Sequence, residues 1–171
     1  MSVEHIQNSV KDVIAYLKEN PKDALSNDPP VTAVMENGLR CRATGADGET
    51  IVTDMPEAIG GNGSAPSPGW LSRAALATCD ATRIALHAAQ LGVTLDTLEV
   101  TADSVSDDRG LLGLDDSVPA GPLSLRTRVT IGATGVAEKT LREIVDFAVA
   151  HSPVADGCRR ATPSKVEVKI A

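Results

Sequence analysis

Cysteine and arginine are the side chains of this sequence whose types and spacing allow chemistry. Cys79 lies in an alanine-rich segment, and Arg83 follows it at position i+4. If the segment is helical, these two residues are neighbours on its surface, and the guanidinium can approach the sulfur. A nearby cation favours the thiolate, the nucleophilic form of cysteine. The alternative is a buried structural cysteine, since free cysteines are among the most buried residues.

Two more arginines flank a second cysteine. Arg40 and Arg42 stand on either side of Cys41 in a segment with a strand-like sequence. Alternation along a strand places both guanidinium groups on one face and Cys41 on the other, toward the core. The two arginines could bind a carboxylate or orient a peroxide. The alternative is a solvated strand face.

The other polar residues do not form a familiar catalytic or metal-binding set. Cys158 is followed by two arginines, a basic setting for a thiol that is also typical of a solvated helix end. His151 and Ser152 are adjacent in sequence and do not make a catalytic triad. His87 shares a helical face with two charged residues, but one helix offers too few ligands for a metal. No CxxC pair is present, which argues against structural zinc. We therefore expect no metal and no cofactor.

Composition excludes several classes of protein. A chain of 171 residues with 42% hydrophobic residues is expected to form one globular domain, perhaps with a short terminal extension. The formal net charge of -7 argues against binding to nucleic acid or to anionic lipid. No apolar run is long enough for a transmembrane helix, and the charged N-terminus lacks a secretory signal. Three widely spaced cysteines fit the reducing cytoplasm.

The first half of the chain has the pattern of a helix followed by a meander of three strands. Apolar residues at helical spacing predict a helix over Val3–Lys18, which ends at Asn20-Pro21. The Asn37-Gly38 pair lies between two apolar-rich segments and predicts a hairpin. The predicted strands are Val31–Met35, Leu39–Ala43 and Glu49–Thr53.

The second half is dominated by one long helix. Trp70–Leu91 is apolar around most of its circumference, which indicates burial on several sides, and Gly92 ends it. The following elements are predicted as strands over Leu95–Val105 and Leu123–Ile131, a helix over Val136–Ala150, a short turn or helix over Pro153–Arg160, and a closing strand over Val166–Ile170. Segregated strands and helices predict an α+β fold with a largely antiparallel sheet.

Four segments together resemble the OsmC/Ohr family of thiol-dependent peroxidases. They are Pro68–Val93 around Cys79, Asp108–Gly113, Ser152–Val154, and the final strand that follows Ala161-Thr162-Pro163. The resemblance covers residues 31–171, which we expect to form an OsmC-like domain. Residues 1–30 lie outside it and are expected to be a helical extension and linker.

The resemblance implies a fold and an activity. The fold would be an intertwined homodimer, with antiparallel sheets around long central helices. In the family, a thiolate at the position of Cys79 reduces an organic hydroperoxide or hydrogen peroxide, an activity of the oxidative stress response. The resulting sulfenic acid condenses with a second cysteine, and a dithiol reductant restores the enzyme. An arginine from an early strand, here Arg40 or Arg42, and a glutamate before the cysteine helix position the thiolate.

The sequence departs from this pattern at two positions, and three outcomes stay open. Ser152 occupies the position of the second cysteine, and Gly69 that of the glutamate. First, Cys79 could act as a peroxidase with an external thiol. Second, Cys158 could replace the second cysteine, although it lies roughly 9 Å from Ser152 along a helix axis. Third, the chain could be a non-catalytic OsmC-fold protein that binds a small apolar ligand at the dimer interface.

Overall fold

The computed structural model describes residues 2–170. The chain divides into two compact units. Unit 1 contains the first helical turns up to Gln7 and the chain from Leu76 onward, and unit 2 contains Asn8–Ala75. The boundaries of the units fall within two helices, α1 (Val3–Glu19) and α2 (Pro68–Gln90).

Helix α1 follows the prediction from its apolar spacing and ends one residue later than expected. None of its 17 residues, all of which the structure describes, is buried. Gln7 donates from Nε2 to the carbonyl oxygen of Gln90 at 3.0 Å. This bond satisfies a carbonyl at the C-terminal end of α2 that has no partner within its own helix. A short 3-10 helix (Pro21–Ala24) follows α1.

Unit 2 is built on the predicted meander. Strands β1 (Thr32–Asn37), β2 (Arg40–Thr44) and β3 (Thr50–Thr53) form an antiparallel sheet in that order. Gly38 has a φ of +56° in the first turn, a left-handed conformation that glycine adopts without strain. The register shifts between Met35 and Asn37, so the end of β1 bulges opposite the start of β2.

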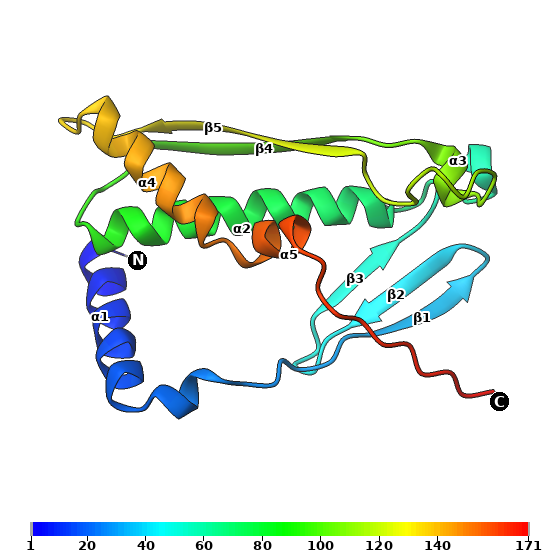
Figure 1. Cartoon of the computed structure of the whole chain (residues 1–171), viewed down its shortest axis with the longest axis horizontal. Helices are drawn as coiled ribbons and strands as arrows, with labels where there is room; N and C mark the ends of the chain where they lie inside the picture. Colours follow the sequence, from blue (N-terminus) through cyan, green and yellow to red (C-terminus); the bar gives the residue numbers. More distant parts are fainter. Residues whose placement is uncertain (1, 171) are drawn as a thin grey trace. The chain divides into compact units, whose positions relative to one another are not determined.

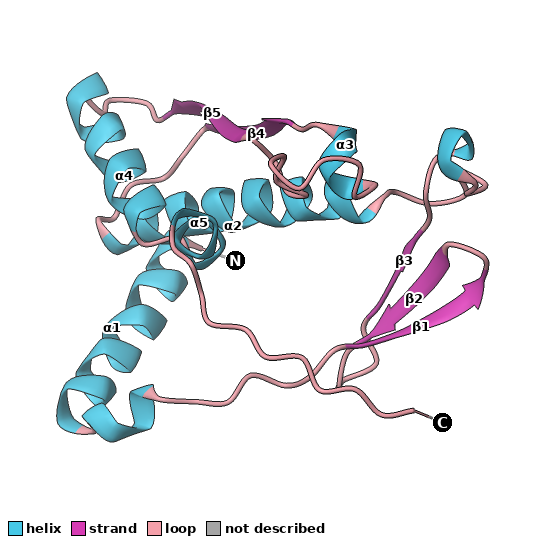
Figure 2. Ribbon diagram, turned by 45° about the vertical axis from the view of Figure 1, so that its right-hand side comes forward, coloured by secondary structure: helices cyan, strands magenta, loops and turns pink. Residues whose placement is uncertain are grey.

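Unit 1 packs helices against a two-stranded antiparallel ribbon. Strands β4 (Thr97–Val105) and β5 (Ser124–Gly132) pair along their whole length, and a short helix, α3 (Asp108–Leu111), lies between them in the chain. Helices α4 (Glu138–Ala150) and α5 (Pro153–Arg159) follow β5. The ribbon lies along α2, and α4 crosses near the end of that helix (Figures 1 and 2). The predicted α+β class with antiparallel sheets is confirmed.

The core of unit 1 joins α2 to α4. Ile84 and Ala88 of α2 and Ile144 and Ala148 of α4 are fully buried together. The inward residues of the ribbon cover this cluster, as the predicted alternation of β5 requires. These inward residues are Leu98, Val100, Val129 and Ile131.

The predicted closing strand is wrong for this chain. Residues 161–170 form neither helix nor strand, and Val166, Val168 and Ile170 are 85%, 77% and 87% exposed. Alternating hydrophobicity predicts a segment that suits a sheet, but a strand also needs a neighbour for its backbone hydrogen bonds. Within residues 2–170, this segment pairs with no other strand.

The expected burial of α2 is also only partly met. Five of its residues are buried, and four of them lie on the face that carries Leu76, Asp80, Ile84 and Ala88. Its other faces stay partly open in the single chain. No helix in the described part of the chain is long and apolar enough to cross a membrane.

At one end of the ribbon in unit 1, a carboxylate ties the residue before β4 to the segment after β5. Asp96 accepts hydrogen bonds at Oδ2 from the backbone nitrogen and the hydroxyl of Thr134, at 2.6 and 2.7 Å. The hydroxyl bond and then the backbone bond hold the pKa of Asp96 below its ordinary value. A lowered pKa stabilises the fold above the pKa of the unfolded chain, and this contribution disappears as the pH falls through the folded value.

We therefore predict that Asp96→Asn makes the protein less sensitive to acid. Urea unfolding between about pH 5 and pH 2 should show a smaller loss of unfolding free energy in the variant than in the wild type. Asp28→Asn, in the exposed connector before β1, serves as the matched control and should keep the wild-type acid dependence. An acid response of Asp96→Asn that matches the control would contradict the assignment.

Candidate functional site

The thiol of Cys79 is held by a hydroxyl group. Ser67 caps the start of α2 by accepting from the backbone nitrogen of Trp70 at 3.2 Å, and Cys79 lies half-buried near the middle of this helix. Ser152 donates from Oγ to Sγ of Cys79 at 3.3 Å. Ser152 is completely buried, so no bulk water competes for this bond. A hydrogen bond to sulfur is strongest when the sulfur carries charge, so this contact suits a thiolate or a sulfenate.

Ser152 is positioned by the junction between α4 and α5. Its backbone nitrogen donates to the carbonyl oxygen of Val149 at 3.3 Å, and its own carbonyl accepts from Asp156 at 2.8 Å. Pro153 begins α5 directly after it, a position where the missing N–H costs nothing. The end of one helix and the start of the next therefore fix the hydroxyl against the sulfur.

Arg83 is held by the same junction, one residue earlier. Its Nε donates to the carbonyl oxygen of His151 at 3.2 Å. No carboxylate lies within ion-pair distance of Arg83 anywhere in residues 2–170. Its Nη groups stay available for a ligand. The structure thus brings Cys79, Arg83 and Ser152 together in unit 1.

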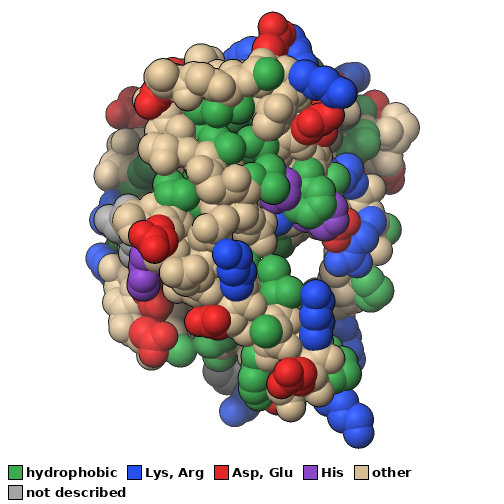
Figure 3. Space-filling model, turned by 90° about the vertical axis from the view of Figure 1, so that its left-hand side faces the viewer, with side chains coloured by type: hydrophobic (Ala, Val, Ile, Leu, Met, Phe, Trp, Pro, Cys, Tyr) green, Lys and Arg blue, Asp and Glu red, His purple; other side chains and the backbone are tan. Residues whose placement is uncertain are grey.

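An aromatic stack continues the site along α2 and α4. The ring of Phe147 lies between the rings of His87 and His151, with centroid distances of 4.0 and 4.2 Å. His151 contacts the carbonyl of Phe147 through Nδ1 at 2.7 Å, which requires a proton on that nitrogen. Figure 3 shows histidine side chains among hydrophobic ones on the face it draws.

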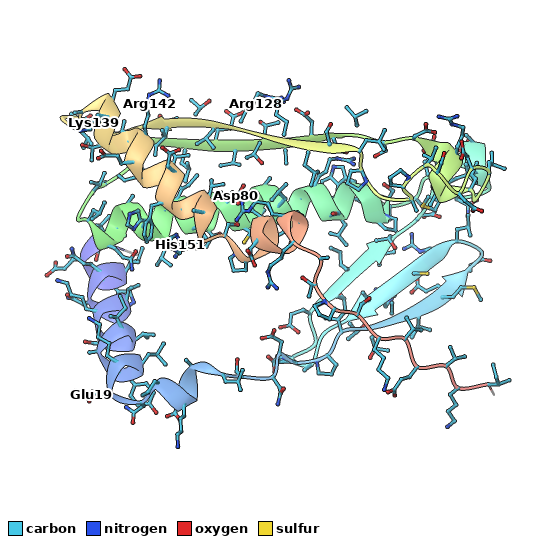
Figure 4. All side chains as sticks on the ribbon, viewed as in Figure 1. Glu19, Asp80, Arg128, Lys139, Arg142 and His151 are labelled. Carbon is cyan, nitrogen blue, oxygen red and sulfur yellow. The ribbon has the colours of Figure 1, made fainter. Side chains whose placement is uncertain are left out.

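One buried carboxyl on α2 has no partner. Both side-chain oxygens of Asp80 are buried and make no hydrogen bond within residues 2–170. The residue is 1% exposed and follows Cys79 directly, on the face that packs inward with Leu76 and Ile84. A polar group buried without a partner costs free energy. Figure 4 labels Asp80 on α2 and His151 after α4.

The two early arginines lie in unit 2 and share one carboxylate. Glu36 of β1 accepts from Nε of Arg40 at 2.9 Å and from Nε of Arg42 at 2.6 Å. The bond from Arg42, followed by that from Arg40, holds the pKa of Glu36 below its ordinary value. Arg40 also donates from Nη1 to the hydroxyl of Ser64 at 2.6 Å. The predicted common face of the two arginines is consistent with this arrangement, whereas the sequence analysis did not identify Glu36.

A buried aspartate organises the glycine-rich loop of unit 2. Asp54 is 1% exposed and accepts from the hydroxyl and backbone nitrogen of Ser64 at 2.7 and 3.1 Å. It also accepts from the backbone nitrogens of Met55 and Asn62. The Ser64 hydroxyl makes the largest contribution to lowering the pKa of Asp54. Gly61 is required here, because a Cβ at this position would lie 1.8 Å from the Met55 carbonyl oxygen.

The remaining predicted site residues lie on other elements or at the start of α2. Cys158 is exposed on α5, Cys41 is half-buried on β2, and all three cysteines are free thiols. Gly69 lies in the first turn of α2. No group of three or more histidine, cysteine or acidic side chains in residues 2–170 is arranged to hold a metal ion.

Comparisons with known proteins agree on one family. The family model described as OsmC-like protein matches residues 61–167. No curated protein matches this sequence.

Solved structures with the same fold are distant in sequence. An OsmC-like protein from Mycoplasma pneumoniae has a TM-score of 0.66 at 16% identity, covering 79% of this chain and 89% of its own. An organic hydroperoxide resistance protein OsmC from Legionella pneumophila has a TM-score of 0.58 at 20% identity, covering 79% and 91%. OhrB of Bacillus subtilis, also an organic hydroperoxide resistance protein, has a TM-score of 0.51 at 19% identity, covering 78% and 91%. These likenesses support the fold, and the matched family model shows that this chain belongs to the OsmC-like family.

Proposed function

We propose that this protein is a thiol-dependent peroxidase with a single reactive cysteine, Cys79, acting in the oxidative stress response. The observation that carries the proposal is the hydrogen bond from the buried Ser152 hydroxyl to Cys79 Sγ. It holds the sulfur in one orientation and stabilises negative charge on it. Arg83 adds a cation without a carboxylate partner one helical turn away.

The first step reduces the peroxide. The thiolate of Cys79 attacks the outer oxygen of an organic hydroperoxide or of hydrogen peroxide, and the O–O bond breaks. The sulfur is oxidised to a sulfenic acid, and the leaving oxygen takes up a proton to become an alcohol or water. We expect Arg40 or Arg42 to contribute a guanidinium to this step, as the family resemblance implies.

The second step needs a thiol from outside the site. Ser152 occupies the place of the family's second cysteine, and its hydroxyl cannot form a disulfide. Cys158 lies on the exposed surface of α5, the helix that begins after Ser152. An external thiol therefore condenses with the sulfenic acid and releases water, and a second thiol equivalent restores Cys79. The three free thiols support a reducing cytoplasm as the place of this reaction.

We predict that the purified protein consumes cumene hydroperoxide or hydrogen peroxide with dithiothreitol as reductant, and that Cys79→Ser abolishes this turnover. The loss follows because a serine hydroxyl is a far weaker nucleophile than a thiolate at neutral pH. Cys41→Ser, on β2, is the matched control for replacing a cysteine and should keep turnover.

Equal background rates of peroxide consumption in the wild type and in Cys79→Ser would rule out the proposed peroxidase activity. The alternative, a protein that binds a small apolar ligand, would then have to be considered. Unit 1 contains a groove of ≈ 700 Å³ whose lining includes Val129, Val145 and Val149.

We further predict that Ser152→Cys creates a resolving cysteine. The hydroxyl of Ser152 already lies 3.3 Å from Cys79 Sγ, so a thiol placed there needs only a small shift to bond. One equivalent of peroxide should convert this variant to an internal disulfide, seen by intact mass as the loss of two hydrogen atoms. Ser152→Ala is the control and should instead give a sulfenic acid that dimedone traps. The variant carries four cysteines, the three native ones and the introduced one, so an internal disulfide leaves two thiols free. If Ser152→Cys forms no internal disulfide after oxidation, the proposed proximity in solution is wrong.

We also propose that the active form is a homodimer. The outer strands of both sheets have no further partner within residues 2–170, and residues 161–170 have a strand-like sequence without a strand to pair with. Together with the apolar surface left open on α2, these features favour a second copy as the missing cover.

Light scattering during gel filtration should give twice the chain mass of 17.7 kDa. Val168→Lys places a charge on the alternating apolar face of the last segment and should shift the protein toward monomer. Lys169→Ala, on the other face, should leave the mass unchanged. A monomeric wild type at micromolar concentration would contradict the proposed dimer.

A further inference from the structure

Unit 1 carries two arginines, Arg83 on α2 and Arg159 on α5, that donate to backbone carbonyls and make no ion pair within residues 2–170, although the whole chain has a net charge of -7. Arg83 has no carboxylate partner within the described residues, and His87 follows it on the same helical face. On α5, Arg160 is balanced by Asp156, while Arg159 donates only to backbone carbonyls at the end of α4. The opposing acids are the buried Asp80 on α2, and Asp146, exposed on α4.

Arg83 is fixed relative to the sulfur rather than merely near it. Residues at positions i and i+4 of a helix have Cβ atoms about 5–6 Å apart. Successive residues of the α4–α5 junction then hold both groups, His151 through its carbonyl on Arg83 and Ser152 through its hydroxyl on Cys79. With Nε engaged, the two Nη groups of Arg83 remain free to bind a carboxylate in a bidentate manner.

Ser152 determines where the thiol that reacts with Cys79 comes from, and therefore which thiols the guanidinium of Arg83 can attract. No second sulfur occupies the position next to Cys79, so every disulfide at Cys79 that uses this site must join it to an outside molecule. Cys79 is only half-buried, so a small molecule can reach it, and the group fixed one turn away is a cation.

We infer that Cys79 forms a mixed disulfide with a small acidic thiol, one that carries a carboxylate, and that Arg83 binds this carboxylate. The inference rests on the thiol chemistry proposed above and names the class of its external reductant. A sulfenic acid at Cys79 condenses with the thiol, an S–S bond forms, and water leaves. A second molecule of the thiol attacks the mixed disulfide on the sulfur of the first, releasing their symmetric disulfide and the Cys79 thiolate.

The test uses exchange with small disulfides, because this reaction needs no peroxide. Reduced protein is mixed with 3,3′-dithiodipropionate, which is anionic, or with cystamine, which is cationic. In each case the Cys79 thiolate breaks the S–S bond of the reagent and releases a thiolate. Peptide mass spectrometry gives the rate of adduct formation at Cys79. The ratio of the two rates is divided by the same ratio for 2-mercaptoethanol, an uncharged thiol, which removes the intrinsic reactivity of each reagent.

We expect this normalised ratio to favour the anionic reagent by about fivefold or more in the wild type, and to fall as salt is added. Arg83→Gln should bring the ratio close to one, and Arg83→Lys should retain a preference because it keeps the charge. Arg142→Gln, which removes an exposed arginine paired with Glu138 on α4, is the control and should behave as the wild type.

A normalised ratio near one in the wild type, or a preference that survives in Arg83→Gln, would overturn the inference. The peroxide assay tests the proposed peroxidase activity independently of this exchange ratio. A protein that exchanges with charge selectivity but does not consume peroxide would keep the acidic-thiol site and lose the peroxidase.

Discussion

The hydrogen bond from Ser152 to Cys79 is the contact on which the rest of the site depends. It joins the middle of α2 to the junction of α4 and α5, two segments that are far apart in sequence. The cluster of Ile84 and Ala88 with Ile144 and Ala148 fixes these helices against each other. Close packing of such a cluster leaves little freedom to slide, so the core sets the distance between hydroxyl and sulfur.

In the proposed peroxidase, a serine at the position of the family's second cysteine would change how oxidising equivalents leave the protein. A pair of cysteines would keep them within the chain as a disulfide until a dithiol arrives. A lone sulfur with a hydroxyl neighbour would instead pass them directly to a separate molecule. The charge beside the sulfur, carried by Arg83, would then contribute to the choice of that molecule, as we infer above.

Much of the fold could be predicted from periodicity alone. The helical spacing of α1, the Asn37-Gly38 turn and the alternation of β5 each gave the right element, because local pattern and final packing agree at these places. The closing strand failed because Val166, Val168 and Ile170 satisfy the pattern while their backbone finds no neighbour among residues 2–170. A strand forms only beside another strand that pairs with its backbone, and the alternating pattern of one segment does not identify that partner.

The site was predictable in part. Helical spacing placed Arg83 beside Cys79, and the family resemblance drew attention to Ser152, but no spacing rule brings residue 152 to residue 79. Glu36 was missed because a bulge after Met35 changes the register of β1. Asp54 was missed because its partners are backbone groups of a loop, whose path follows from glycine conformations rather than from side-chain pattern.

The unpartnered carboxyl of Asp80 has a consequence for motion. It lies on the inward face of the same helical turn as the thiol, where each neighbouring turn contributes an aliphatic side chain to the core. Burial of the Asp80 turn against the core contributes less stabilisation than burial of the turns around Ile84 and Ala88. Thermal fluctuations should therefore detach the Asp80 turn before those two turns. The helical turn that detaches most easily would then carry the reactive sulfur, and a local opening there would widen the access that the half-buried thiol already has.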